Sequence, residues 1–206
     1  ARSNVGKTSF HASMVASPKG FAAQGASCMV LCNEEGSPRV GARYLQACTG
    51  MTLMQIKENP KAAWDMYGKI RNNIFLKDVT GKDMGWVESV CKSYKPDIVV
   101  LDMGDKFATT QGFARTDEAL KANVVYARQI AKMYECAMFY MSQLSADAEG
   151  KVLLNQSMME GSRTGKAAEA DLMVLIAKNP QVEGQDEEDA QRHLNIVKNK
   201  LSGWHG

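Results

Sequence analysis

Short apolar runs alternate with longer stretches of helical periodicity along this chain. Strands are predicted at the apolar runs 27–32, 73–77, 97–102, 137–141, 171–176 and 193–198. Helices are predicted from Lys7 onward, with apolar positions at Phe10, Met14, Val15 and Phe21, and over 37–50, 52–66, 84–94 and 117–134. This alternation is typical of an α/β fold, a mainly parallel twisted sheet flanked by helices, in one domain spanning residues 1–206.

Composition narrows the class of protein without identifying an activity. Hydrophobic residues make up 45% of the 206 positions and charged residues 23%, as in ordinary soluble domains. The net charge of +2 argues against a broad nucleic-acid-binding face, so any such contact has to come from local loops. No apolar run is long enough to span a membrane, and we expect no membrane partner. The five cysteines lie mostly in apolar runs, which indicates buried free thiols and a cytoplasmic location.

The first residues carry the most informative motif. Ala1, Arg2, Ser3, Asn4, Val5, Gly6, Lys7 and Thr8, followed by Ser9, match the phosphate-binding loop G-x-x-x-x-G-K-[ST] except that alanine replaces the first glycine. In such a loop consecutive N–H groups surround a phosphate at a helix N-terminus, the lysine reaches the β- and γ-phosphates, and the hydroxyl ligates Mg²⁺. The motif predicts binding of ATP or another nucleoside triphosphate; the alternative is a chance Gly-Lys-Thr at a helix start.

The position of this loop in the chain is unusual. A strand normally leads into a phosphate-binding loop, and here it would have to precede Ala1. We therefore expect that the first strand is missing and that the sequence is a fragment of a longer protein.

Acidic and amide side chains follow three of the predicted strands. Asp102 ends the most apolar strand, where it can serve the Mg²⁺ shell, although Asp also ends strands because it favours turns. Glu34 and Glu35 follow another strand; either one could activate a water, or both are solvated acids ahead of a helix. Gln143 is either a sensor of the γ-phosphate or a polar residue leaving the core.

Taken in order, these motifs resemble the motor domain of DnaB-type replicative helicases, a family that includes phage primase–helicases. The residues that carry the resemblance are Gly6-Lys7-Thr8, Asn33-Glu34-Glu35 with Arg43, residues 50–57, 97–102, 141–144 and the late Ile196-Val197-Lys198-Asn199-Lys200-x-x-Gly203. The resemblance covers essentially the whole chain. It implies a RecA-like P-loop NTPase that hydrolyses ATP with Mg²⁺, assembles into a hexameric ring and translocates on single-stranded DNA during replication.

The resemblance also implies roles for single residues. Lys7 and Thr8 would bind phosphate and Mg²⁺, Glu34 (or, one register away, Glu35) would activate water, Asp102 would serve the metal, and Gln143 would couple the γ-phosphate to the DNA side. Lys198 and Lys200 stand where the family has a lysine and an arginine finger that act on the neighbouring subunit's nucleotide. Lysine lacks the planar fork of arginine, so Lys200 departs from the pattern.

DNA-contacting loops of the family correspond to residues 106–116 and 145–163. Candidate contacts there are Lys106, Arg115, Lys151, Arg163 and, just beyond, Lys166. The alternative for each of them is an ordinary surface charge.

Three other functions fit the motifs: a RecA-like recombinase or repair ATPase, a circadian-clock-type ATPase, and a non-catalytic P-loop module kept for assembly. An acidic stretch at 182–189 is expected to be a solvated loop.

Overall fold

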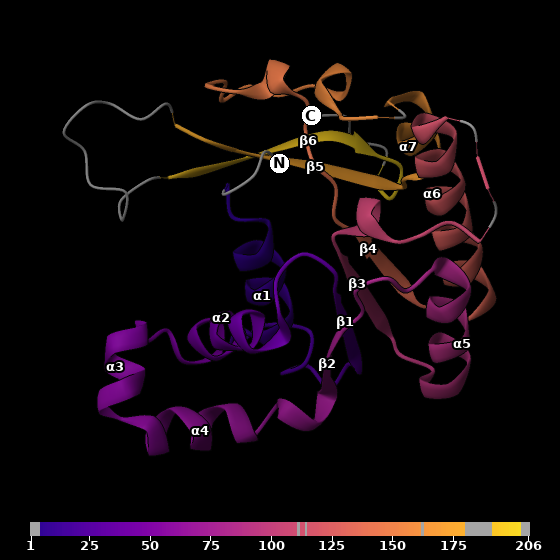
Figure 1. The fold of residues 1–206 in the computed structure, drawn as a ribbon. Coiled ribbons are helices and arrows are strands. Elements are labelled where there is room, and N and C mark those ends of the chain that lie inside the picture. Colours follow the sequence, from indigo (N-terminus) through magenta and orange to yellow (C-terminus); the bar gives the residue numbers. More distant parts are fainter. Residues whose placement is uncertain (1–4, 111, 114, 162, 180–190, 203–206) are drawn as a thin grey trace.

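The computed structural model is a three-layer α/β domain with a strand hairpin above one end of the sheet (Figure 1). It describes residues 5–110, 112–113, 115–161, 163–179 and 191–202. Ala1 to Asn4, the whole acidic stretch 182–189 and Gly203 lie outside the described residues. Within those residues no helix combines the length and the apolar character needed to cross a bilayer.

Four parallel strands form the main sheet in the order β2-β1-β3-β4. The strands are β1 (Cys28–Cys32), β2 (Ile74–Asp78), β3 (Ile98–Asp102) and β4 (Ala137–Tyr140). All residues of the two central strands, β1 and β3, are buried, which explains why they are the most apolar runs. The predicted strand positions and the parallel arrangement are thus confirmed.

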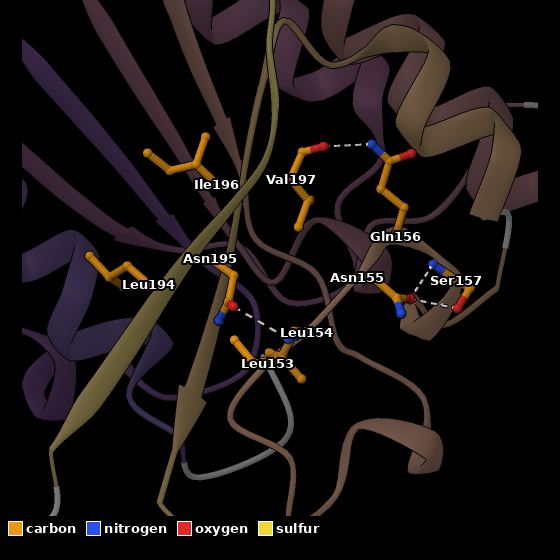
Figure 2. Close-up of a pocket in the computed structure, with 9 residues that line it drawn as sticks. All are labelled: Leu153, Leu154, Asn155, Gln156, Ser157, Leu194, Asn195, Ile196 and Val197. Carbon is orange, nitrogen blue, oxygen red and sulfur yellow. Dashed lines mark hydrogen bonds between the residues drawn. The ribbon is translucent and has the colours of Figure 1, made fainter. Parts of the chain in front are cut away.

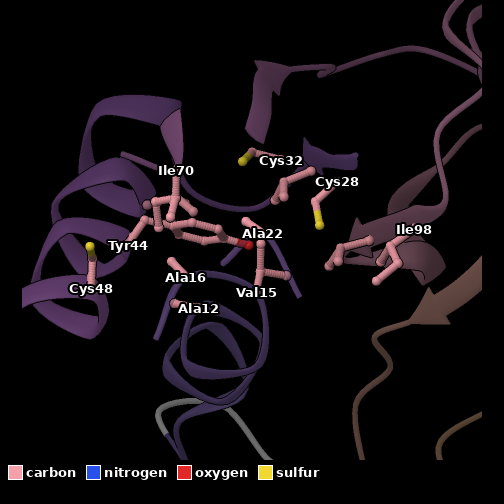
Figure 3. Close-up of a cluster of buried hydrophobic side chains, with 13 residues drawn as sticks. Ala12, Val15, Ala16, Ala22, Cys28, Cys32, Tyr44, Cys48, Ile70 and Ile98 are labelled. Carbon is pink, nitrogen blue, oxygen red and sulfur yellow. The ribbon is translucent and has the colours of Figure 1, made fainter. Parts of the chain in front are cut away.

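Two helical layers cover the sheet. On one face α1 (Lys7–Ala16) and α2 (Ser37–Thr49) pack on alternate residues of β1 and β3, including Cys28, Val30 and Val100. Tyr44 extends from α2 into the middle of this cluster (Figure 3). On the other face α5 (Met84–Tyr94) and α6 (Thr116–Met133) pack on Met29, Leu31, Val99 and Leu101. This alternation follows from the two-residue period of a strand.

Two predicted helices are shorter than expected because of proline. The segment 52–66 was predicted as one helix, but it forms α3 (Leu53–Glu58) and α4 (Pro60–Gly68), separated at Asn59. Pro60 has no N–H to donate and disfavours a helical conformation at Asn59, so the prediction of one helix was wrong. In the same way α1 ends before Pro18, and its buried face is formed by residues such as Ala12 and Val15 instead of Phe10 and Met14.

The last two strands form a separate antiparallel pair. Strand β5 (Leu172–Lys178) follows the short helix α7 (Arg163–Glu169), and it pairs with β6 (Arg192–Asn199). In the described residues neither strand joins the four-stranded sheet. Met173, Leu175 and Ala177 pack against Leu144, Ala148, Leu154, Met158 and Met159, so the polar stretch after β4 has a small core of its own.

Candidate nucleotide-binding site

The described part of the phosphate-binding motif forms the start of α1. Gly6 precedes the helix with φ of 104°, a left-handed conformation that favours glycine. Lys7 and Thr8 lie in the first turn and are buried, while Val5 is buried beneath the loop. Ser9 points outward and is exposed. The helix N-terminus, the lysine and the hydroxyl are therefore together at one point, as an anion-binding loop requires.

Asp102 lies directly opposite this turn. It is the last residue of β3, it is 1% exposed, and its Oδ2 accepts a hydrogen bond from Thr8 Oγ1 at 3.3 Å. Among the described residues Asp102 Oδ1 has no hydrogen-bond partner although it is buried. A buried carboxylate oxygen without a partner, beside a threonine hydroxyl, is the oxygen donor set that Mg²⁺ prefers. Thr8 and Asp102 thus fit the predicted metal site.

A histidine that the sequence analysis missed completes this cluster. His11 is 1% exposed, and its Nε2 lies 3.1 Å from Asp102 Oδ2. The contact is a polar one, and within the described residues Nε2 makes no regular hydrogen bond. His11 Nδ1 lies 2.9 Å from the Tyr44 hydroxyl. The signal in the sequence was its spacing: His11 is three residues after Thr8 and therefore shares its helix face.

The two candidate bases differ in their partners. Glu35 Oε2 lies 2.7 Å from Arg43 Nη1 and 3.7 Å from Arg39 Nε, so two arginines on α2 hold it. Glu34 Oε1 lies 3.4 Å from Lys106 Nζ, a cation that follows β3. Because Cys32 pairs with Asp102 across β1 and β3, Glu34 follows a strand end that adjoins the Asp102 strand end. Arg43, whose spacing from Glu34 supported the family resemblance, pairs with Glu35 in the structure.

Gln143 follows the neighbouring strand β4, at the same edge of the sheet. Its backbone carbonyl accepts a hydrogen bond from Glu160 N at 3.3 Å, which ties it to the stretch before α7. The preceding residue, Ser142, donates to Asp105 Oδ2 at 2.6 Å. Strand ends β1, β3 and β4 therefore bring Glu34, Asp102 and Gln143 to one edge, as the sequence predicted.

Lys166 is not the surface cation that was expected to contact DNA. Its residue exposure is 3%, and its Nζ donates to Asp105 Oδ2 at 2.9 Å, Ser142 Oγ at 2.8 Å and Glu160 O at 3.0 Å. The Lys166 side chain is only 4% exposed, so it has no access to a phosphate in this conformation. A buried charge needs polar partners in place of water, and three nearby oxygens replace the lost hydration of this ammonium group.

Lys198 and Lys200 lie at the far end of β6 from the phosphate-binding loop. The first residue of that strand, Arg192, donates from Nε to Val5 O at 2.8 Å. Lys198 is six residues further on, which is about 20 Å at roughly 3.4 Å per residue. Its Nζ contacts Ala167 O at the end of α7, and burial together with the neighbouring Lys200 lowers its pKa. Neither lysine is positioned to reach a nucleotide at its own Lys7.

The other candidate DNA contacts come from separate parts of the chain. Lys106 and Lys151 are exposed, and Arg115 Nη2 pairs with Asp117 Oδ2 at 3.0 Å. Lys106 lies beside Glu34, as described above, and Arg163 is the first residue of α7.

A pocket of about 900 Å³ lies beside β6 and is separate from the phosphate-binding loop (Figure 2). Its walls are residues 153–157 and 194–197. The segment 152–156 is held on β6 by Asn195 Nδ2 to Val152 O (3.0 Å) and Gln156 Nε2 to Val197 O (2.8 Å). The residues that line the pocket carry no ionisable side chain, so the phosphate chemistry belongs to the Lys7–Asp102 site.

The cysteines confirm the expectation of free, buried thiols. Burial raises the pKa of Cys28 to about 11 and that of Cys32 to about 12, with nearby carboxylates contributing less. Within the described residues no group of three or more metal-binding His, Cys, Asp or Glu side chains occurs. The five thiols are thus part of the buried core.

Comparison with known proteins shows the fold. No protein-family model matches the chain, and no curated protein matches its sequence. Among solved structures, an ATPase domain matches with a TM-score of 0.83 at 18% identity, over 100% of this chain and 76% of that one. A structure of a DnaB-like replicative helicase, which also describes that helicase's interactions with primase, matches with a TM-score of 0.79 at 18% identity. The match covers 100% of this chain, which spans about half (52%) of that helicase chain.

Fold and site together define the class of protein domain. The four-stranded parallel sheet with helices on both faces is a RecA-like α/β fold, and Lys7 and Asp102 lie at the carboxyl edge of that sheet. Within that class, the chain has the fold of the ATPase domains of DnaB-like replicative helicases, as the sequence resemblance predicted.

Proposed function

We propose that this chain is the ATP-hydrolysing motor domain of a DnaB-type replicative helicase. One observation carries the proposal: the Lys7–Thr8 turn faces a buried Asp102 whose Oδ1 has no partner among the described residues. A carboxylate that was merely ending a strand would be solvated or fully hydrogen-bonded. The shared fold with DnaB-like ATPase domains supports the same proposal.

Each residue at this edge has a distinct task in the proposal. The N-terminus of α1 and Lys7 bind the β- and γ-phosphates, and Ala1 to Ser9 carry the sequence motif for this binding. Thr8 and Asp102 would hold Mg²⁺, which supplies positive charge to the phosphate oxygens when bound. Glu34 orients a water and accepts its proton, since Glu35 is held by Arg43. Gln143 senses the γ-phosphate beside the buried Lys166 cluster.

The partners are proposed from the same resemblance. Single-stranded DNA would be contacted by exposed cations such as Lys106, Arg115 and Lys151, and subunits would assemble into a hexameric ring. Lys198 and Lys200 would act on a neighbouring subunit's nucleotide, because the length of β6 separates them from the loop of their own chain. We place the protein in the cytoplasm, in keeping with its free thiols.

The test compares nucleotide binding, hydrolysis and strand separation in the complete protein. Lys7→Ala should abolish binding of a magnesium–nucleotide complex by calorimetry, whereas Lys19→Ala, an exposed lysine just after α1, should bind as the wild type does. The wild type should hydrolyse ATP faster with single-stranded DNA and unwind a forked duplex. DNA-stimulated hydrolysis without unwinding would favour a recombinase, and tight binding without hydrolysis would favour an assembly module. Wild-type affinity in Lys7→Ala would remove the proposal.

A further inference from the structure

His11 occupies a position where the chain could have carried any small core residue. It lies on the buried face of α1, with Ala12, Val15 and Ala16 as its buried neighbours on the helix. A polar ring that is only 1% exposed has to be compensated by polar partners, or it costs stability. The partners that His11 has are Asp102 on one side and Tyr44 on the other.

The hydrogens of this cluster can be assigned from its chemistry. An ionised carboxylate only accepts, so the His11 Nε2 atom that faces Asp102 carries a hydrogen. Burial raises the pKa of Tyr44 well above its usual value, so its hydroxyl keeps its proton and can donate to Nδ1. Tyr44 therefore fixes the tautomer, and the Nε2 side of His11 lies against Oδ2 in a polar contact of 3.1 Å that is not a regular hydrogen bond. The chain of contacts runs from Tyr44 through His11 to Asp102.

The consequence for Asp102 concerns its two oxygens. Thr8 Oγ1 and His11 Nε2 both lie near Oδ2, at 3.3 Å and 3.1 Å, whereas Oδ1 has no partner in the described residues. A partial rotation of the carboxyl plane would lengthen both contacts, whereas a half-turn only exchanges two equivalent oxygens. Two contacts on one oxygen thus hold the group in an orientation that leaves the other oxygen for a ligand.

We propose that His11, fixed by Tyr44, is a positioning residue that orients the Asp102 carboxylate for the Mg²⁺ site. The inference rests on the proposed nucleotide site, but His11 itself contacts neither nucleotide nor metal in it. Partners of this kind, one step removed from the metal, change metal affinity by about 10- to 100-fold when they are mutated. The role is independent of the phosphate-binding loop, which reaches the nucleotide without Asp102.

The ring and the hydroxyl of Tyr44 have different roles: the ring packs in the core, and the hydroxyl contacts His11. Its ring lies in the cluster between α1 and α2, where it is fully buried (Figure 3). Tyr44→Phe retains the ring and removes only the hydroxyl that holds His11. The variant therefore changes the orientation of the imidazole with little change in packing.

The test measures Mn²⁺ binding by electron paramagnetic resonance in the complete protein, saturated with a non-hydrolysable ATP analogue. His11→Ala should weaken Mn²⁺ binding about 10-fold or more. His11→Gln should restore most of it, because the glutamine amide can replace the Nε2 donor, whereas His11→Asn, which is too short, should not. Tyr44→Phe should lie between wild type and His11→Ala. Binding of ADP without a divalent ion should be the same in all of them.

The control is Val15→Ala, which removes buried volume from α1 one turn further along, away from Asp102. It should lower the melting temperature and leave Mn²⁺ affinity unchanged. Unchanged Mn²⁺ affinity in His11→Ala, or equal loss in Val15→Ala, would overturn the inference. If His11→Ala does not fold, a wild-type affinity in Tyr44→Phe together with no difference between His11→Gln and His11→Asn overturns it. A wild type that binds no nucleotide would instead remove the proposed function.

Discussion

Lys166 on α7 donates a hydrogen bond to Asp105, which lies three residues after the end of β3, at 2.9 Å. Ser142 at the end of β4 joins the same cluster, and it precedes Gln143. One buried cation thus connects two strand ends of the candidate nucleotide site to α7, the helix that follows the stretch after β4. The contact links parts of the chain that are 61 residues apart.

Replacing Lys166 should destabilise the protein more than replacing a surface lysine. Lys166→Met removes the cationic partner of the largely buried Asp105 carboxylate, and breaking a fully buried ion pair typically costs up to about 3–5 kcal/mol in free energy of unfolding. Lys151→Met, at an exposed position, should change it by less than about 0.5 kcal/mol. Urea unfolding of the complete protein measures both. Equal effects would show that the Lys166 contacts add nothing.

For DNA binding the order of the two effects should be reversed, with Lys151→Met having the larger effect and Lys166→Met the smaller one. If Lys151 contacts a phosphate, Lys151→Met should reduce the salt dependence of single-stranded DNA binding by about 0.7 in log–log slope. Lys166→Met should leave that slope unchanged, because its ammonium has no access to a phosphate. Fluorescence anisotropy at several salt concentrations gives both slopes. A reduced slope in Lys166→Met alone would mean that the cluster opens on binding DNA.

Replacement of Glu34 should lower the ATP turnover number more than replacement of Glu35 does. Glu34→Gln should reduce ATP turnover by about 10²-fold or more, the scale of a lost general base, with nucleotide affinity near normal. Glu35→Gln should have a smaller effect, since that carboxylate pairs with Arg43. Steady-state hydrolysis and calorimetry on the two variants decide between them. A slower Glu35→Gln would place the base one residue later than we propose.

Lys200 should act only between subunits. Lys200→Ala should lower turnover in the assembled protein without changing nucleotide affinity, and Lys200→Arg should retain or raise it, because guanidinium can bridge two phosphate oxygens. Mixing Lys200→Ala with Glu34→Gln subunits creates some interfaces with both residues intact, so activity should exceed the sum of the separate variants. Strict additivity in verified mixed assemblies would leave Lys200 a surface lysine.

Arg192 should support the phosphate-binding loop from β6. Its Nε donates to Val5 O, and hydrogen bonds from charged groups contribute about 1.5–3 kcal/mol. Arg192→Ala should therefore weaken nucleotide binding by roughly 10-fold or more. Arg192→Gln, which keeps a donor, should lose less. Unchanged affinity by calorimetry in Arg192→Ala would show that the loop keeps its shape without this contact.

The parallel sheet and the edge at which the site lies could be predicted from the sequence. Runs such as 97–102 are apolar along their whole middle, and only a strand covered on both faces accommodates them. The spacing of Gly6, Lys7 and Thr8 likewise encodes its own local structure, because a glycine before the first helical turn is a short-range requirement. Both signals are carried by neighbouring residues, and periodicity detects them.

Which distant polar groups meet was visible only once the chain was folded. His11, Tyr44 and Asp102 come from two helices and a strand, and Lys166 and Asp105 are far apart in the chain. A lysine in a helix is an ordinary surface charge by its sequence context, and only the packing of α7 shows that this one is buried. The energy of such a group depends on what surrounds it in three dimensions, because burial and partners together set whether a charge is stabilised.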